Sequence, residues 1–203
     1  MTLPALEVLM RTVAHGLHQA NASFAIVGGL AVGARLGPRF TRDVDFAIAV
    51  TNDSEAEAIL NHFVQRGFRP EVDISHAITG RLHTMRLIPP SLTGANPEEG
   101  LPLADFLFAT SGIEIETVAS ATPAILAPDL KLPTARIPHL IAMKCLSESD
   151  RRLQDRIDLQ NLCAAATPTD LDEAHQLVNL ISQRGYAHDK DLHATLAQFT
   201  NAK

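Results

Sequence analysis

The sequence contains few aromatic residues. Phe, Tyr and Trp together make up 4% of the 203 residues, and Trp is absent. Proteins that bind single-stranded nucleic acid without sequence preference stack the bases on aromatic side chains, so the composition argues against such a platform. The formal net charge of −6 also argues against general affinity for nucleic acid, which depends on excess Lys and Arg. Local basic clusters could still bind RNA or a triphosphate.

Cysteine is almost as scarce, and long apolar runs are missing. Cys145 and Cys163 do not form a CxxC pair and both lie in apolar helical patterns, which predicts buried thiols in a reducing compartment. No apolar run approaches the ~20 residues that a membrane helix needs, and residues 1–19 do not resemble a signal peptide. We therefore expect a cytoplasmic protein that does not bind a membrane.

The hydrophobic content of 46% is enough for a core, and its periodicity changes along the chain. Residues 1–137 mix strand and helix patterns, whereas residues 138–203 show helical patterns only. We predict an α/β (α+β) fold with a core over 1–137 and a helical region over 138–203 packed on it. Residues 112–121 are ambiguous and fit a half-exposed strand, and residues 126–135 fit irregular chain or a short strand. The other expected strands are 24–27, 43–50, 68–74, 82–88 and 103–109.

Two acidic residues, Asp43 and Asp45, begin the second of these strands. Side chains alternate between the two faces of a strand, so both carboxylates lie on one face. The large apolar residues lie on the other face, and these are Val44, Phe46, Ile48 and Val50. Two anions at this spacing repel each other unless a positive charge lies between them. The pattern therefore favours a divalent cation.

A glycine pair, Gly28 and Gly29, stands between an apolar strand and a predicted helix over residues 30–36. Glycine lets the backbone approach a ligand closely, and the N–H groups at a helix N-terminus suit a phosphate. A phosphate site beside two carboxylates is what a metal-assisted nucleotide reaction needs. Arg42, next to Asp43, could bind phosphate oxygens with two parallel donors or remain a solvated charge.

Two further charged residues lie in apolar surroundings. Asp105 interrupts the run LADFLFA, and a buried carboxylate is costly unless it is paired or bound to a metal. It could be a third metal ligand or accept a bond from a nearby backbone N–H, and Glu114 or Glu116 is the competing third carboxylate. Lys144 lies on an apolar helix face, where a lysine needs an anionic partner.

The order and spacing of Gly-Gly and TRDVD resemble the signature of the polymerase-β-like nucleotidyltransferases. The stretches VGGLAVGARLGPRFTRDVDFAI and HLIAMKCLSESDRRLQDRIDLQNL are similar to AbiEii-type nucleotidyltransferases, many of them toxins of toxin–antitoxin pairs. This resemblance implies a mixed sheet flanked by helices, followed by a C-terminal helical segment. It also implies two Mg²⁺ ions bound by Asp43, Asp45 and Asp105, the last of which could also act as general base.

The resemblance further implies that the nucleotide lies against a set of residues from both parts of the chain. These residues are Gly28, Gly29, Arg42, Lys144 and Asp155. For Asp155 and for Asp158, three residues further along the same helix face, the structural alternative is a set of salt bridges with arginines of the same segment. The arginines in question are Arg151, Arg152 and Arg156.

The function that the resemblance implies is a Mg²⁺-dependent transfer of a nucleoside monophosphate (NMP) from a nucleoside triphosphate (NTP) such as ATP to an acceptor hydroxyl. The acceptor would belong to tRNA, a protein or a small molecule, and a cognate antitoxin would neutralise the enzyme. Two other classes remain open. One is a nucleotide-binding regulatory or antitoxin module without turnover, and the other is a metal-dependent phosphohydrolase.

Overall fold

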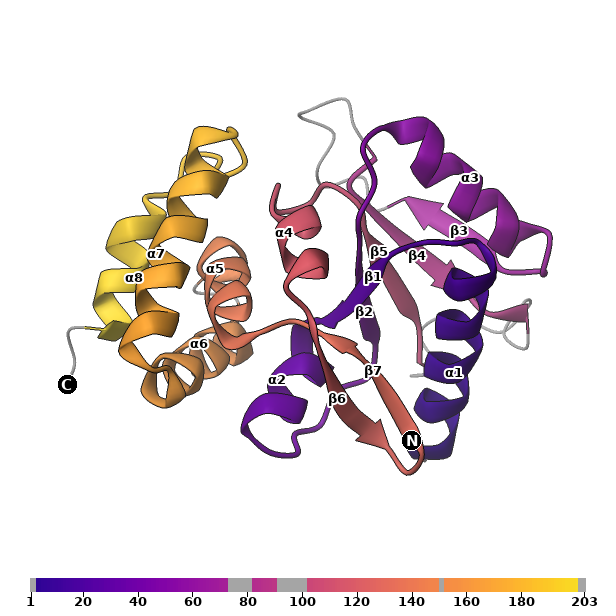
Figure 1. Cartoon of the computed structure of the whole chain (residues 1–203), viewed down its shortest axis with the longest axis horizontal. Coiled ribbons are helices and arrows are strands. Elements are labelled where there is room, and N and C mark those ends of the chain that lie inside the picture. Colours follow the sequence, from indigo (N-terminus) through magenta and orange to yellow (C-terminus); the bar gives the residue numbers. More distant parts are fainter. Residues whose placement is uncertain (1–2, 73–81, 91–101, 150–151, 201–203) are drawn as a thin grey trace.

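A seven-stranded sheet forms the centre of the computed structural model, which describes residues 3–72, 82–90, 102–149 and 152–200. The strand order is β3-β4-β5-β2-β1-β7-β6 (Figure 1). The strands are β1 (Phe24–Val27), β2 (Val44–Ile48), β3 (Arg69–Val72), β4 (Thr84–Ile88), β5 (Ala104–Leu107), β6 (Thr122–Ala127) and β7 (Leu130–Thr134).

The sheet is mixed. Strand β1 runs antiparallel to β2 and parallel to β7, and β2 runs parallel to β5. The pairs β3–β4, β4–β5 and β6–β7 are antiparallel. This arrangement places β2, which carries the predicted carboxylates, between two other strands. The predicted α/β fold with a mixed sheet flanked by helices is confirmed.

Eight helices accompany the sheet in the described part of the chain. They are α1 (Leu3–Gln19), α2 (Gly28–Leu36), α3 (Asp53–Val64), α4 (Glu114–Ala119), α5 (Ile137–Ser147), α6 (Leu153–Ala165), α7 (Pro168–Gln183) and α8 (Leu192–Thr200). Helices α1 and α3 cover one face of the sheet, α2 and α4 lie on the other, and α5–α8 pack beyond them (Figure 1). Over the described residues, no helix combines the length and apolarity needed to cross a bilayer.

The core under α1 and α3 is built from the apolar face of the sheet. Phe46 of β2, Phe106 of β5 and Phe63 of α3 are fully buried. The ring of Phe106 meets the other two edge to face, at centroid distances of 5.8 Å and 5.1 Å, which is a favoured aromatic geometry. Burial of Phe46 on this face leaves Asp45, its neighbour in β2, on the opposite face, as the alternation predicted.

Three segments differ from the sequence expectations. Residues 114–119 form helix α4, because the Glu114 carboxylate accepts bonds from N–H and Oγ of Ser111 and closes a turn there, and such local bonds compete with strand pairing. Residues 122–134 form the β6–β7 hairpin, in which Pro123 lies on the edge strand, where proline is tolerated. Helix α2 begins at Gly28, two residues earlier than expected.

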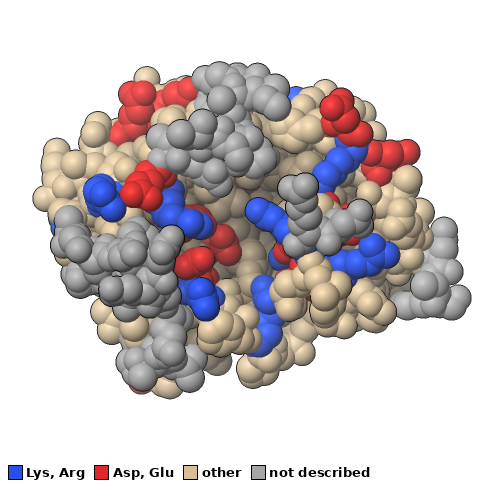
Figure 2. Space-filling view, turned by 180° about the vertical axis from the view of Figure 1, so that it is seen from behind, with Lys and Arg blue, Asp and Glu red and all other residues tan. Residues whose placement is uncertain are grey.

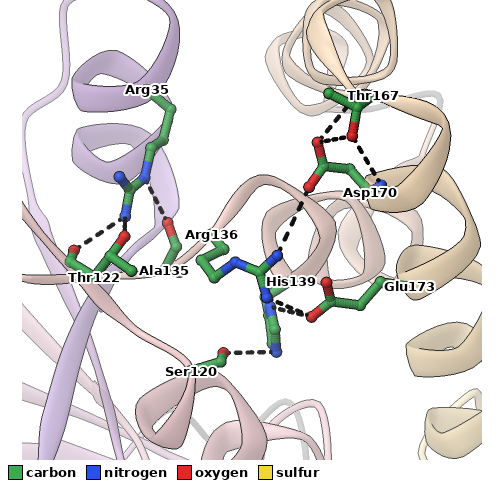
Figure 3. Close-up of polar contacts among 9 residues, drawn as sticks. All are labelled: Arg35, Ser120, Thr122, Ala135, Arg136, His139, Thr167, Asp170 and Glu173. Atoms are coloured by element: carbon green, nitrogen blue, oxygen red, sulfur yellow. Dashed lines mark hydrogen bonds and ion pairs between the residues drawn. The ribbon is translucent and has the colours of Figure 1, made fainter.

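The C-terminal helices are joined to the sheet by polar contacts around the start of α5 (Figure 3). Arg136 lies 2.8 Å from Glu173 and 3.8 Å from Asp170, both in α7. Nε2 of the buried His139 lies 3.0 Å from Oγ of Ser120, which follows α4. These contacts pack the helical region on the core. The division between residues 137 and 138 as a domain boundary stays a prediction.

Candidate active site

The two carboxylates of the TRDVD segment lie where β2 begins. Asp45 is paired in register with Val27 at the end of β1 and with Asp105 in β5. Asp43 stands just before the strand, and its Oδ1 accepts a hydrogen bond from N–H of Leu103 at 3.2 Å. The strand pairing therefore brings acidic residues from two neighbouring strands to the same end of the sheet.

The glycine pair packs directly against this acidic end. A β-carbon on Gly28 would come within 1.9 Å of Oδ2 of Asp45, and the φ angle of Gly28 is +60°, which disfavours other residues. A β-carbon on Gly29 would come within 2.3 Å of Nη2 of Arg39. Val27, the N-cap of α2, makes no side-chain cap hydrogen bond. The N-terminus of α2 thus lies beside Asp45, and the side chain of its N-cap residue accepts no hydrogen bond from the first N–H groups of the helix.

The charge of Asp45 is poorly compensated. Burial, together with the neighbouring carboxylates of Asp105 and Asp43, raises its pKa to about 7, against the lowering effects of Lys144 and Arg86. No donor in the described part of the chain forms a hydrogen bond with its carboxylate. Burial also raises the pKa of Asp43, which the N–H of Leu103 and, more weakly, the nearby exposed Arg42 act to lower. A cation between these acids would remove an unfavourable interaction.

Asp105 has a partner that the sequence did not reveal. Arg86 of β4 lies opposite it in register and donates from Nε to Oδ1 at 2.9 Å and from Nη2 to Oδ2 at 2.8 Å. Such a bidentate pair is the strongest geometry for this kind of contact. Among the described residues, no three acidic, histidine or cysteine side chains are grouped so that they could hold a metal ion. The oxygen donors suit Mg²⁺ in chemistry, but both oxygens of Asp105 are bound to Arg86.

The alternative third carboxylates have other contacts. Glu114 is buried, and its Oε1 accepts bonds from N–H and Oγ of Ser111 at 2.6 Å and 2.8 Å. Glu116 receives two bonds from Arg184, the C-cap residue of α7, at 2.6 Å and 3.0 Å. Both glutamates therefore serve the packing of α4. Only Asp105 among these three acids is in register with Asp45.

Lys144 on α5 has the anionic partners that its apolar surroundings demand. Its Nζ lies 2.5 Å from Oδ1 of Asp155 and 2.9 Å from Oδ2 of Asp158, both in α6. Lys144 also lies near enough to Asp45 to lower the pKa of that carboxyl group. Lys144 and Asp155, which were each predicted to lie near the nucleotide, thus form an ion pair with each other, beside the carboxylates of the sheet.

The expected arginine contacts of this segment are only partly present. Arg152 lies 3.7 Å from Oδ2 of Asp155, whereas Arg156 lies 3.5 Å from Glu148 instead. Arg151 falls outside the described residues. Asp155 is therefore paired mainly with Lys144 and, at longer range, with Arg152.

Two further residues, Asp158 and Arg39, complete this network. Asp158 is 1% exposed and binds Arg39, whose Nη2 lies 3.2 Å from its Oδ2. The Nε of Arg39 also donates to the carbonyl of Gly29 at 3.2 Å. The spacing of Asp158 from Asp155 on one helix face was a usable signal. Arg39 gave no local signal, because its partner lies in the C-terminal helices.

One face of the molecule carries charges of both signs. Figure 2 shows acidic and basic side chains gathered around a hollow on the face behind that of Figure 1. A different depression, of about 450 Å³, is lined by residues that include Ser23, Ala49 and His62. Because Ser23 precedes β1 and Ala49 follows β2, this depression lies at the other end of these strands from Asp43. It does not contain the carboxylates.

Solved structures with the same fold include nucleotidyltransferases. An antigenic nucleotidyltransferase-like protein from Paracoccidioides brasiliensis superposes with a TM-score of 0.54 at 19% identity, over 97% of this chain and 94% of that chain. The solution structure of the antibiotic-resistance factor ANT(2'')-Ia superposes with a TM-score of 0.52 at 16% identity, over 92% and 96%. A crystal structure of ANT(2'')-Ia with adenylyl-2''-tobramycin gives 0.53 at 14% identity, over 87% and 97%.

At these identities the likeness shows the fold alone. No curated protein matches the chain in sequence. The family is shown by a different comparison, in which the model of the nucleotidyl transferase AbiEii toxin, type IV toxin–antitoxin system, matches residues 11–202. The chain therefore belongs to the AbiEii family of nucleotidyl transferase toxins.

Proposed function

We propose that this protein transfers an NMP from an NTP to an acceptor hydroxyl, with divalent cations bound at Asp43, Asp45 and Asp105. The observation that carries the proposal is the position of Asp45. Its carboxylate lies against Gly28 at the start of α2, in register with Asp105 and without a hydrogen-bond donor among the described residues. A half-buried acid that is held in this way gains a favourable partner only when a cation arrives.

The residues around Asp45 offer contacts to a triphosphate. The first N–H groups of α2, beginning at Gly28 and Gly29, suit phosphate oxygens. Lys144 supplies a positive charge near Asp45, and Asp155 orients its ammonium group through the 2.5 Å contact. Arg42 is exposed beside Asp43 and is available for a bidentate phosphate contact. We assign all five residues to nucleotide binding.

The proposed reaction is an in-line displacement. An acceptor oxygen attacks the α-phosphorus, the bond from that phosphorus to the bridging oxygen breaks, and pyrophosphate leaves with the electron pair. A carboxylate of the site takes the proton of the acceptor hydroxyl. Bound Mg²⁺ would neutralise the phosphate charge and lower the pKa of that hydroxyl. The chain itself contributes the positions of the acids, the helix N-terminus and the lysine.

The acceptor is proposed to be a hydroxyl of tRNA or of a protein in the cytoplasm. The family description as a toxin of a type IV toxin–antitoxin system favours a cellular macromolecule and a cognate antitoxin. ANT(2'')-Ia has been crystallised with an adenylylated antibiotic, and this favours a small-molecule hydroxyl as the second candidate. The two candidates differ in the size of the labelled product.

The test is to incubate the protein with Mg²⁺, total RNA, cell protein and each α-labelled NTP in turn. We expect label on RNA or protein, and we expect Asp45→Asn to abolish it while the circular dichroism spectrum stays unchanged. Label that binds without transfer would instead support a regulatory nucleotide-binding module. Release of free NMP would support a phosphohydrolase, and full activity of Asp45→Asn would rule out the assigned site.

A further inference from the structure

Arg86 and Asp105 form an ion pair in the place where a cation is expected. The two residues lie directly across from each other on the antiparallel strands β4 and β5. The guanidinium uses two donors and engages both carboxylate oxygens. The side chain of Arg86 is 43% exposed, whereas that of Asp105 is 13% exposed. The carboxylate is therefore held by the strand, and the guanidinium reaches it from the surface.

The three acids at this end of the sheet are compensated unequally. Asp105 has a full positive charge at hydrogen-bond distance, Asp43 has one backbone N–H, and the neighbours of Asp45 include both of these carboxylates. A divalent ion that used Asp105 as a ligand would need an oxygen that Arg86 now occupies. Bidentate binding of the guanidinium uses one lone pair on each oxygen, and its positive charge repels a metal ion that approaches the remaining lone pairs.

We propose that Arg86 is a competitor of the metal: it neutralises Asp105 in the metal-free protein and leaves when a divalent cation binds. This inference rests on the proposed function, because it assumes that Asp105 is a metal ligand. Asp105 is too buried to remain an unpaired anion without cost, so one cation must replace the other. The side chain of Arg86 is 43% exposed, so water can solvate its charge when it leaves Asp105.

The test measures metal affinity and requires no substrate. Mn²⁺ binding is measured by isothermal titration calorimetry on the wild type and on Arg86→Met, which removes the charge and keeps most of the apolar stem. We expect a dissociation constant about tenfold lower in Arg86→Met, since one charged neighbour changes the affinity of a carboxylate for a cation by about one to three orders of magnitude. Equal or weaker binding by Arg86→Met would overturn the inference.

Arg69→Met is the matched control. Arg69 lies on the adjacent strand β3 and pairs with Glu71 at 3.1 Å, so its removal deletes the same charge without touching Asp105. Its Mn²⁺ affinity is expected to stay within twofold of the wild type. A gain as large as that of Arg86→Met would mean that net charge alone is responsible, and the inference would fail.

Thermal unfolding gives a second readout if Arg86→Met folds poorly without metal. Ligands that bind the folded state raise Tm, so added Mn²⁺ should raise the Tm of Arg86→Met more than that of the wild type. Arg86→Lys, which retains the charge, should resemble the wild type. An equal rise of Tm in all three proteins would contradict the competition.

Asp45→Asn separates this inference from the proposed function. If that variant loses Mn²⁺ binding while Arg86→Met has the wild-type affinity, the result supports the proposed metal site and contradicts the proposed competition by Arg86. If neither the wild type nor Arg86→Met binds Mn²⁺, the result contradicts both the proposed metal site and the proposed competition. Tighter binding in Arg86→Met that disappears in the double variant Arg86→Met with Asp45→Asn supports both.

Discussion

Oδ2 of Asp45 lies against the α-carbon of Gly28, so closely that a β-carbon there would come within 1.9 Å of it. The glycine is thus required by the carboxylate, whatever ligand the helix N-terminus binds. Because Gly28 begins α2 and Asp45 lies in β2, the contact fixes the helix start relative to the acids. Two motifs that are separate in the sequence form one structural unit.

Gly28→Ala is predicted to disturb that unit. We expect it to lower the free energy of unfolding by roughly 2–4 kcal/mol, because the positive φ angle is strained and Asp45 must move, and to reduce transfer at least tenfold. Gly185→Ala is the control, since Gly185 has a φ of +79° but open space around it. It should cost roughly 1–2 kcal/mol and leave transfer unchanged. Urea unfolding and label transfer measure both effects.

The raised pKa of Asp45 predicts that stability depends on pH. The folded protein holds a proton on this group at pH values where the unfolded chain does not, since the pKa is about 7 in the fold and 3.8 without it. The free energy of unfolding should therefore fall as pH rises from about 4 to 7 and level off above. The loss from this group amounts to at most about 4 kcal/mol.

Asp45→Asn should remove this dependence, because the amide stays neutral at every pH. We expect the variant to unfold at higher urea concentration than the wild type at pH 8 and at a similar concentration at pH 4. Asp172→Asn, at an exposed position on α7, is the control and should follow the wild type. Parallel wild-type and Asp45→Asn curves across this range would show that Asp45 does not carry the predicted proton.

Lys144→Ala is predicted to raise the KM for NTP more than it lowers kcat, because the lysine is assigned to ground-state binding of the triphosphate. It should also destabilise the fold by roughly 3–5 kcal/mol, since the buried Asp158 loses a partner. Arg152→Ala removes the exposed cation on the other side of Asp155 and should change neither quantity appreciably. An unchanged KM in a folded Lys144→Ala protein would make the lysine a purely structural residue.

We predict that two variants, Asp105→Asn and Glu116→Gln, will identify the third carboxylate of the metal site. Asp105→Asn should abolish transfer and weaken Mn²⁺ binding, because Asp105 is in register with Asp45. Glu116→Gln should retain both transfer and Mn²⁺ binding. It should lower only the stability of the fold, because it weakens the two bonds that Arg184 donates to Glu116. Loss of Mn²⁺ binding in Glu116→Gln with retention in Asp105→Asn would reverse this assignment.

The sequence predicted those parts of the fold in which local pattern and tertiary environment agree. The apolar run around Asp105 and the alternation in β2 depend on burial, which acts on every residue of a strand, and both predictions held. The glycine pair and the two acids were recognisable because they are close in the chain. The ambiguous segment 112–121, which fitted a half-exposed strand, instead contains helix α4, because a local contact between Glu114 and Ser111 stabilises a helix there.

The contacts that the sequence could not predict join distant segments. Arg86 lies opposite Asp105 only because β4 and β5 are neighbours in the sheet, and neither residue indicates that order. The same holds for Arg39, which lies in the loop before β2 while its partner Asp158 lies in α6. The β6–β7 hairpin was missed because its prolines hide the strand pattern.

The link from Arg39 to Asp158 also limits how the protein can be shortened. A fragment ending at residue 137 would keep the acids and the glycine pair, yet its arginine at position 39 would lose the buried carboxylate of residue 158 that pairs with its guanidinium. The same cut would discard the lysine at position 144, which lowers the pKa of Asp45. Expression of the sheet half alone should therefore yield an acidic cluster that keeps Arg86 on Asp105 but lacks the charge of Lys144 beside Asp45, and the C-terminal helices are as much a part of the site as the strands.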